Sequence, residues 1–133
     1  MKKVFVNGTF DVLHTGHLLL FEYAKSLGDY LIVAIDSDER VREKKGPTRP
    51  INSLWDRAFM LANLYHIDEV RTFDSDDDLI ELVKYYNPDI MVVGSDWKDK
   101  PVIGSQYAKE LKFFDRINEY SSTKTIQSII NRG

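Results

Sequence analysis

The chain has 133 residues, a length suited to one domain with a single hydrophobic core, so we expect residues 1–133 to form one domain. Its formal net charge of −3 gives no whole-molecule attraction to nucleic acid or to an anionic membrane. No cysteine is present, which excludes a disulfide framework, a thiol nucleophile and a cysteine-ligated metal centre. No apolar run is long enough for a signal peptide or a membrane span, so a cytoplasmic protein is expected.

The first half of the chain alternates short apolar runs with amphipathic segments. A strand is expected at residues 4–6, followed by a glycine-containing loop and a helix over residues 15–27, whose apolar residues recur with helical spacing. Gly28 ends that helix, and the almost continuously apolar residues 30–35 predict a strand covered on both faces. Residues 36–52 are polar and contain two prolines and a glycine, which predicts a loop with room for a short helical turn before it.

The second half continues the alternation. Ser53, with Asp56 three residues later, predicts the start of a helix that runs to about Tyr65. The elements expected after it are a strand at 70–73, a helix at 76–86, a strand at 90–93, a helical segment at 104–109, a strand at 111–114 and a helix at 122–131. This order predicts a Rossmann-like α/β fold, a doubly wound parallel five-stranded sheet in a single domain.

Ligands of doubly wound sheets bind beyond the carboxyl ends of the strands, where the strand order reverses. The loop after the first expected strand contains His14 and His17, with Gly16 between them. A spacing of three at a helix start directs both imidazoles to the same side, and Gly16 leaves room for a phosphate against the backbone. The pattern favours two histidines that donate hydrogen bonds to a phosphoryl group during an in-line displacement.

Residues 8–17, Gly-Thr-Phe-Asp-Val-Leu-His-Thr-Gly-His, resemble the His-x-Gly-His motif of the cytidylyltransferase-like nucleotidyltransferases. Residues 45–52 with 56–57 resemble the adenylyltransferase domain of the bifunctional heptose enzymes, which convert heptose 1-phosphate to ADP-heptose. Residues 67–70 and 94–97 are as similar to glycerol-3-phosphate cytidylyltransferase as to the heptose enzymes. Residues 120–124, Tyr-Ser-Ser-Thr-Lys, resemble the Ser-Thr-Thr-Lys element that opens the last helix in both groups. The similarity covers nearly the whole chain.

The resemblance implies catalytic roles for residues that would act on the phosphates. His14 and His17 are expected to contact the α-phosphate and to stabilise its pentacoordinate transition state. Lys45, with Lys44 as the competing candidate, would neutralise charge between the nucleotide and the acceptor phosphate. Arg57 matches an arginine that is used on the phosphates. The competing interpretation of each cation is a solvated surface side chain, and that of each histidine is a helix cap or a packed ring.

The resemblance also implies a set of binding residues around these groups. The backbone N–H groups of Thr9 and Phe10 would hold the α-phosphate together with the turn at Gly16, and Asp11 would organise the acceptor end of the site. Ser122 and Thr123, at the start of the last helix, are expected to bind the β- and γ-phosphates. Gly94, Asp96 and Trp97, after the fourth strand, are expected to contact the base and the ribose.

The implied reaction transfers NMP from an NTP, accompanied by Mg²⁺, to a phosphorylated sugar or polyol and releases pyrophosphate. Residues 45–52 favour adenylyl transfer from ATP to a heptose 1-phosphate-like acceptor. Residues 93–97, Val-Gly-Ser-Asp-Trp, differ from the Lys-Gly-Gly-Asp-Tyr of the heptose enzymes and are closer to the glycerol-phosphate enzymes, which use CTP. Both nucleotides therefore remain candidates, and a glycerol-3-phosphate cytidylyltransferase-like enzyme is the alternative.

A nucleotide-binding sensor without catalysis is an alternative of another class. A sensor needs affinity but no transition-state donors, so the histidine pair together with a lysine favours the enzyme. The acidic residues at 74–78 precede a helix, where carboxylates are favoured by the helix dipole, and no protein metal site is expected there. The family resemblance implies a homodimer, and because no kinase half is found in these 133 residues, the domain is expected to act alone.

Overall fold

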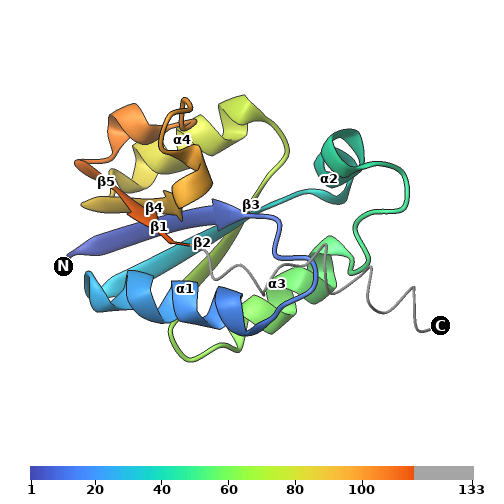
Figure 1. Ribbon diagram of the computed structural model, residues 1–133, viewed down its shortest axis with the longest axis horizontal. Coiled ribbons are helices and arrows are strands. Elements are labelled where there is room, and N and C mark those ends of the chain that lie inside the picture. The colour runs from blue at the N-terminus through green and yellow to red at the C-terminus, as the bar shows by residue number, and fades with distance from the viewer. Residues whose placement is uncertain (116–133) are drawn as a thin grey trace.

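The computed structural model describes residues 1–115, in which short runs of β-branched and aromatic residues form one sheet between layers of helices (Figure 1). The strands are β1 (Lys3–Gly8), β2 (Tyr30–Asp36), β3 (Glu69–Phe73), β4 (Ile90–Gly94) and β5 (Glu110–Phe114). The helices are α1 (Thr15–Ser26), α2 (Asp38–Lys45), α3 (Leu54–Ala62) and α4 (Asp76–Tyr86), with 3₁₀ turns η1 (Ser95–Trp97) and η2 (Ser105–Tyr107).

All neighbouring strands of the sheet are parallel, and their order is β3-β2-β1-β4-β5. The chain moves outward from β1 through β2 to β3, then crosses back to place β4 on the other side of β1. The central strand is therefore flanked by both halves of the fold, with Val6 opposite both Val33 and Val92. The prediction of a Rossmann-like, doubly wound, five-stranded parallel sheet is confirmed.

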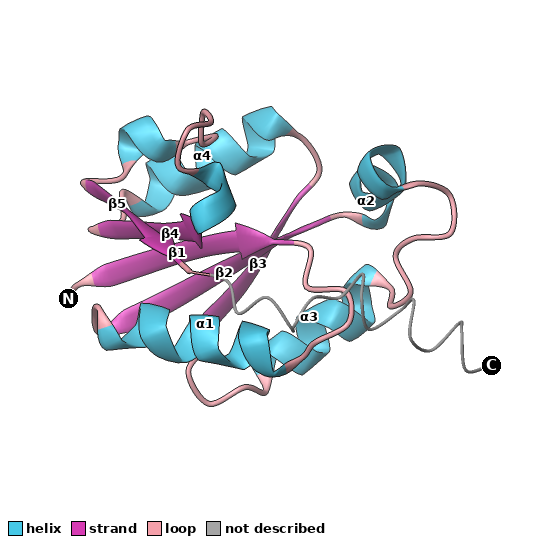
Figure 2. Ribbon diagram, viewed as in Figure 1, coloured by secondary structure: helices cyan, strands magenta, loops and turns pink. Residues whose placement is uncertain are grey.

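The alternation of side chains along each strand sends two separate cores to the two faces of the sheet. Val4 and Val6 pack with Phe21 of α1 and Leu61 of α3 on one face. Phe5 packs on the other face, with α4 residues such as Val83. Figure 2 shows the same division, with α1 and α3 on one side of the magenta sheet and α4 on the opposite side.

Helix α2 is longer than the short turn that the sequence predicts within residues 36–52. Ser37 caps it, because the serine side chain accepts a hydrogen bond from the backbone N–H of Arg40, and Gly46 ends it with a φ of 103°. The sequence of α2 is highly charged and lacks an apolar periodicity, because Val41 is the one apolar residue through which the helix packs on the core. Its last turn carries Lys44 and Lys45, which therefore lie on a helix and not in a loop.

Smaller differences concern where helices end. Helix α3 stops at Ala62, before the expected end near Tyr65, and the helical segment expected over 104–109 is limited to η2. The acidic run at 74–78 behaves as expected, because Ser75 caps α4 and the carboxylates of its first turn lie at the positive end of the helix dipole. Within residues 1–115, no helix is both long and apolar enough to cross a membrane. The helix expected at 122–131 lies outside the described residues.

Candidate active site

A cavity of about 500 Å³ opens at the carboxyl edge of the sheet, around the ends of β1 and β4, between which the strand order reverses. Of the predicted site residues that the structure describes, only Arg57 does not line it. The predicted residues that do line it are Thr9, Phe10, Asp11, His14, Gly16, His17, Lys44, Lys45, Gly94, Asp96 and Trp97. The fold thus brings together residues that lie far apart in the sequence, from Thr9 to Trp97.

The two histidines form a stacked pair at the start of α1. Their ring centroids are 3.8 Å apart and their planes differ by 21°. His14 is the N-cap residue, and its backbone N–H donates to Nδ1 of His17 over 3.2 Å. A ring nitrogen that accepts a hydrogen bond carries no proton, so neutral His17 holds its proton on Nε2 and can donate it to a ligand oxygen. Both side chains are half-buried at the cavity.

Phe10 packs between the His17 ring and the core. Its ring meets that of His17 edge to face, with centroids 5.3 Å apart, and also packs against Phe21 in the core. The ring folds back over Gly8, where a Cβ atom would lie 2.9 Å from the aromatic carbons. Glycine is therefore required at this position by a close approach inside the loop, which holds the backbone of Thr9 and Phe10 at the cavity wall.

Asp11 acts as an internal anchor of the loop that precedes α3. Its carboxylate accepts hydrogen bonds from the backbone N–H groups of Ile51 and Asn52, both over 2.8 Å, and from Nε of Arg49 over 3.0 Å. Burial alone raises the pKa of Asp11, but the two backbone donors and the Arg49 guanidinium outweigh it and hold the pKa below its usual value. The carboxylate thus ties residues 49–52 to the histidine-bearing loop.

Arg57 lies beneath the site and not in it. Its side chain is 0% exposed, and its guanidinium donates to the backbone oxygens of Thr9 and Asn52 and to the Asp38 carboxylate. These three contacts, of 2.8–3.1 Å, join the histidine-bearing loop to the start of α2. The structure therefore does not support the predicted direct contact of Arg57 with a phosphate; it indicates a positioning role, because the residue occupies the inward face of α3.

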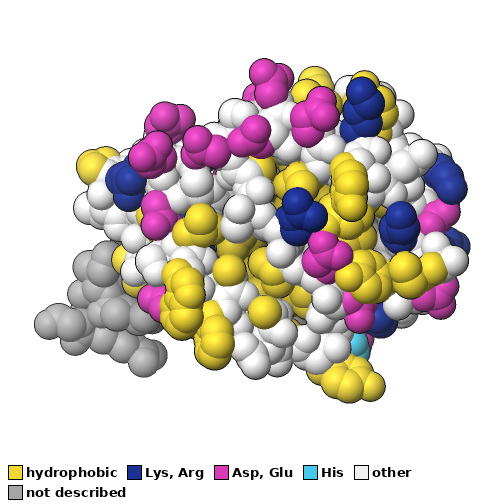
Figure 3. All heavy atoms as spheres, turned by 180° about the vertical axis from the view of Figure 1, so that it is seen from behind, with side chains coloured by type: hydrophobic (Ala, Val, Ile, Leu, Met, Phe, Trp, Pro, Cys, Tyr) yellow, Lys and Arg dark blue, Asp and Glu magenta, His cyan; other side chains and the backbone are white. Residues whose placement is uncertain are grey.

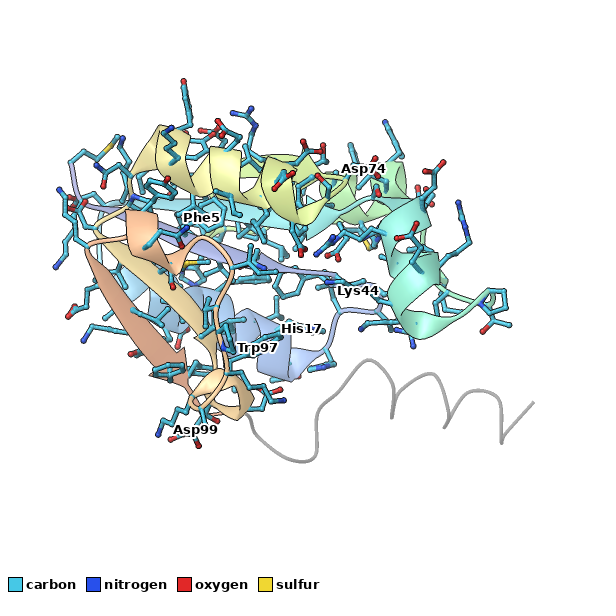
Figure 4. All side chains as sticks on the ribbon, turned by 90° about the horizontal axis from the view of Figure 1, so that it is seen from above. Phe5, His17, Lys44, Asp74, Trp97 and Asp99 are labelled. Atoms are coloured by element: carbon cyan, nitrogen blue, oxygen red, sulfur yellow. The ribbon has the colours of Figure 1, made fainter. Side chains whose placement is uncertain are left out.

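The cationic side of the cavity comes from the end of α2. Lys44 and Lys45 occupy its last turn, are exposed, and both line the cavity. In the view of Figure 4, His17 is drawn between Trp97 and Lys44, and all three residues line the cavity. This arrangement can surround an anion with imidazole, ammonium and backbone N–H donors, the groups that stabilise a phosphoryl transition state.

Three polar residues of the cavity wall were not predicted: Asn7, Asp36 and Arg40. Asn7 is the second-to-last residue of β1, and Asp36 is the last residue of β2. Their positions at the carboxyl ends of adjacent strands are the signal that could have identified them. Among the described residues, no group of three or more histidine and acidic side chains is arranged to hold a metal ion. Ser122 and Thr123 lie outside the described residues.

Comparison with known proteins assigns the chain to a family. Residues 5–128 match the sequence profile of the cytidylyltransferase-like family. The chain belongs to the cytidylyltransferase-like family. This confirms the resemblance drawn from the histidine motif and, with it, the prediction of a nucleotidyltransferase. The cavity lies at the switch point of this fold, where doubly wound sheets bind their ligands.

The relatives of this cytidylyltransferase-like chain include much longer proteins. Bifunctional protein HldE of Sulfurimonas denitrificans is 49% identical over 128 residues, which are 96% of this chain and 27% of that protein. HldE of Helicobacter hepaticus is 46% identical over 96% of this chain and 26% of its own length. The chain thus spans about a quarter of the length of these curated relatives.

Two solved structures share the cytidylyltransferase-like fold of this chain. The lipopolysaccharide core biosynthesis protein of Thermoplasma volcanium superposes with a TM-score of 0.71 at 26% identity, covering 86% of this chain and 97% of that one. A protein with unknown function from Archaeoglobus fulgidus superposes with a TM-score of 0.63 at 21% identity, over 86% of this chain and 90% of that one. The second likeness concerns the fold alone.

Asp11→Asn tests the anchor through its pH dependence. Because the folded pKa of Asp11 is depressed, its carboxylate contributes stability above the unfolded value of about 3.9, and this contribution is lost as the pH falls through the folded pKa. We expect the variant to be less stable than wild type at pH 7 and the difference to narrow below about pH 4. Urea unfolding of wild type and variant at pH 7, 5 and 3 measures this difference in the free energy of unfolding. Asp99→Asn, at an exposed carboxylate, is the control; a difference that stays constant with pH contradicts the anchor.

Proposed function

We propose that this chain transfers NMP from an NTP to the phosphate of a sugar or polyol and releases pyrophosphate, with adenylyl transfer to a heptose 1-phosphate-like acceptor as the favoured reaction. The observation that carries the proposal is the stacked pair of His14 and His17 at the N-terminus of α1, in one cavity with Lys44 and Lys45. An acceptor phosphate oxygen attacks the α-phosphorus, the bond to the bridging oxygen breaks, and pyrophosphate leaves on the opposite side.

The protein contributes alignment and donors to this displacement. The NTP enters as its Mg²⁺ complex, and its α-phosphate lies against the backbone of Thr9 and Phe10 and the first turn of α1. His17 donates from Nε2, since its Nδ1 is occupied by the backbone of His14. Lys45 or Lys44 neutralises the charge between the two phosphates that must approach each other. No covalent enzyme intermediate is required.

The nucleoside is proposed to bind at the end of β4. There Asp96 folds back over Gly94, where a Cβ atom would lie 2.6 Å from the Asp96 carboxylate, and Trp97, with 42% of its surface exposed, offers a ring for stacking. Ser122 and Thr123 are proposed to hold the β- and γ-phosphates. The similarity of residues 94–97 to the glycerol-phosphate enzymes supports CTP, whereas residues 45–52 support ATP.

The acceptor is proposed to be a sugar phosphate. The structure with a TM-score of 0.71 to this chain is that of a lipopolysaccharide core biosynthesis protein, which supports a role in carbohydrate assembly. The resemblance of residues 45–52 to the heptose enzymes supports the same class of acceptor. Cytoplasmic residence follows from such a reaction, because both NTPs and sugar phosphates are cytoplasmic metabolites. No nucleic-acid or membrane partner is needed for it.

A substrate matrix tests the proposed reaction. Each of the four NTPs is combined with heptose 1-phosphate and with glycerol 3-phosphate, and pyrophosphate release is followed. We expect release with ATP and heptose 1-phosphate, since that pair has the strongest sequence support. Turnover with CTP and glycerol 3-phosphate instead would favour the alternative enzyme. Nucleotide binding without pyrophosphate release from any pair would point to a non-catalytic sensor and reject the proposal.

His17→Ala tests the role of the imidazole. Loss of one donor to the transition state is expected to lower kcat by roughly 10²-fold or more, equivalent to about 3 kcal/mol. The matched control is His66→Ala, because His66 is partly exposed and does not line the cavity. Steady-state kinetics of both folded variants decide the matter. Near-normal turnover of His17→Ala would exclude His17 from the chemical step.

A homodimer is proposed on the basis of the outward face of α3. Trp55 and Phe59 stack there with centroids 5.1 Å apart, and they are 70% and 57% exposed. Figure 3 shows hydrophobic side chains gathered at this part of the surface. We expect the wild-type mass in light scattering to be that of two chains and Trp55→Asp to shift it to one. Lys98→Asp, outside α3, should leave the mass unchanged, and a monomeric wild type would refute the dimer.

A further inference from the structure

Strand β3 is the last strand on one side of the sheet and has an open edge. The backbone carbonyl of Phe73 accepts a hydrogen bond from the N–H of Ser37, directly after β2, over 2.9 Å, so the backbone of Phe73 faces β2. The backbone groups of successive residues point to opposite sides of a strand, and those of Val70 and Thr72 therefore face away from the sheet. Within residues 1–115, no backbone group outside the sheet bonds to them.

The edge of β3 is open to pairing with another chain. Proteins commonly protect such an edge with a proline, a lysine or a bulge. The sequence of β3, Glu-Val-Arg-Thr-Phe, contains neither proline nor lysine, and its register with β2 runs without a bulge. Its one cation, Arg71, is held over the α4 face of the sheet, because Nη1 donates to the Tyr86 hydroxyl over 2.7 Å and lies 3.4 Å from the Glu69 carboxylate. The outward backbone groups thus stay accessible.

A groove runs between this edge and helix α4. It is lined by Arg71 and Thr72 of β3 and by Asp78, Glu81, Leu82 and Tyr85 of α4. The four α4 residues have the spacing i, i+3, i+4 and i+7, so they form one stripe along the helix. Asp78 and Glu81 are exposed, Leu82 is half-buried, and Tyr85 is 75% exposed. The stripe, which we call the α4 stripe, offers two carboxylates, an apolar patch and an aromatic ring.

An extended polypeptide matches the edge and the α4 stripe together. Its backbone can pair with the outward groups of Val70 and Thr72, and its side chains then alternate between the two faces of the sheet. Side chains on the α4 face lie over the stripe, where a lysine or arginine is attracted by Asp78 and Glu81 and can contact the Tyr85 ring. Side chains on the other face meet Val70, which packs on the α1-face core and favours apolar residues. The two carboxylates repel a nucleic acid.

We propose that the edge of β3 and the α4 stripe bind an extended segment of another protein, in which basic and apolar residues alternate, by addition of a strand to the sheet. The residues that line this groove all differ from those that line the cavity with the histidines. Binding at the edge therefore leaves the cavity open and needs no nucleotide. The inference goes beyond the proposed nucleotidyl transfer and does not depend on it.

A fluorescently labelled octapeptide of alternating lysine and valine tests the strand addition, with binding followed by anisotropy. Thr72→Pro removes the outward N–H and leaves the bonds to β2 in place, since proline is tolerated where the N–H of an edge strand faces solvent. We expect it to weaken binding about 10-fold, because a backbone hydrogen bond to the peptide is lost. Thr72→Ala keeps the N–H and is the matched control. No binding to wild type, or equal binding by the two variants, overturns the proposal.

Charge reversal in the α4 stripe tests the preference for a basic segment. Glu81→Lys is expected to weaken binding of the lysine–valine peptide about fivefold, since an attraction at the surface becomes a repulsion. Glu43→Lys, at an exposed position of α2, changes the net charge equally and is the control. A peptide of alternating glutamate and valine should not bind wild type. Equal affinity for the two peptides, or equal losses in the two variants, contradicts the role of the stripe.

Amide hydrogen exchange shows whether the edge is accessible before the peptide is added. In the protein alone, the amides of Val70 and Thr72 are expected to exchange faster than those of Arg71 and Phe73, which face β2, and the lysine–valine peptide should slow them. Protection of Val70 and Thr72 without peptide overturns the proposal. If light scattering also shows a dimer that Thr72→Pro dissociates, the edge pairs with a second copy of this chain and not with another protein. Thermal unfolding verifies that each variant is folded.

Discussion

The geometry of the site depends on a buried polar network that joins loops distant in the sequence. Asp11 holds residues 49–52 through two backbone N–H groups, and Arg57 connects Asn52 and Thr9 to Asp38 at the start of α2. Each buried charge has several partners, which is the condition under which such charges are tolerated in a protein interior. The network fixes where α2 begins relative to the histidine loop, and hence where its lysines can reach.

The cavity beside this buried network has two chemically different regions. On the α1 face, a helix N-terminus and two stacked imidazoles offer donors to phosphate oxygens. On the α4 face, Asn7 and Asp36 offer acceptors between apolar walls. The parallel sheet makes this separation possible, because adjacent residues of one strand project to opposite faces at the same edge. The α1 side thus offers hydrogen-bond donors, and the α4 side offers acceptors.

The comparisons show one fold within proteins of different length. A structure only 26% identical to this chain retains the architecture with a TM-score of 0.71 over 86% of the chain. The HldE relatives contain the matching segment in about a quarter of their length. Both observations agree with a domain whose core contacts, described here for residues 1–115, lie within the segment itself.

The sequence alone was sufficient for the features that depend on neighbouring residues. Strand and helix periodicity predicted the sheet, and the spacing of His14 and His17 across a helix start predicted two rings on one side. Only the tertiary structure determined which side chains point into the core and which point into the cavity. Arg57 lies on the inward face of α3, so it is a buried anchor and not the predicted phosphate contact. The alternation of side chains along the strands places Asn7 and Asp36 in the cavity. Local patterns encode periodicity, whereas partners far apart in the chain meet only when the sheet is assembled.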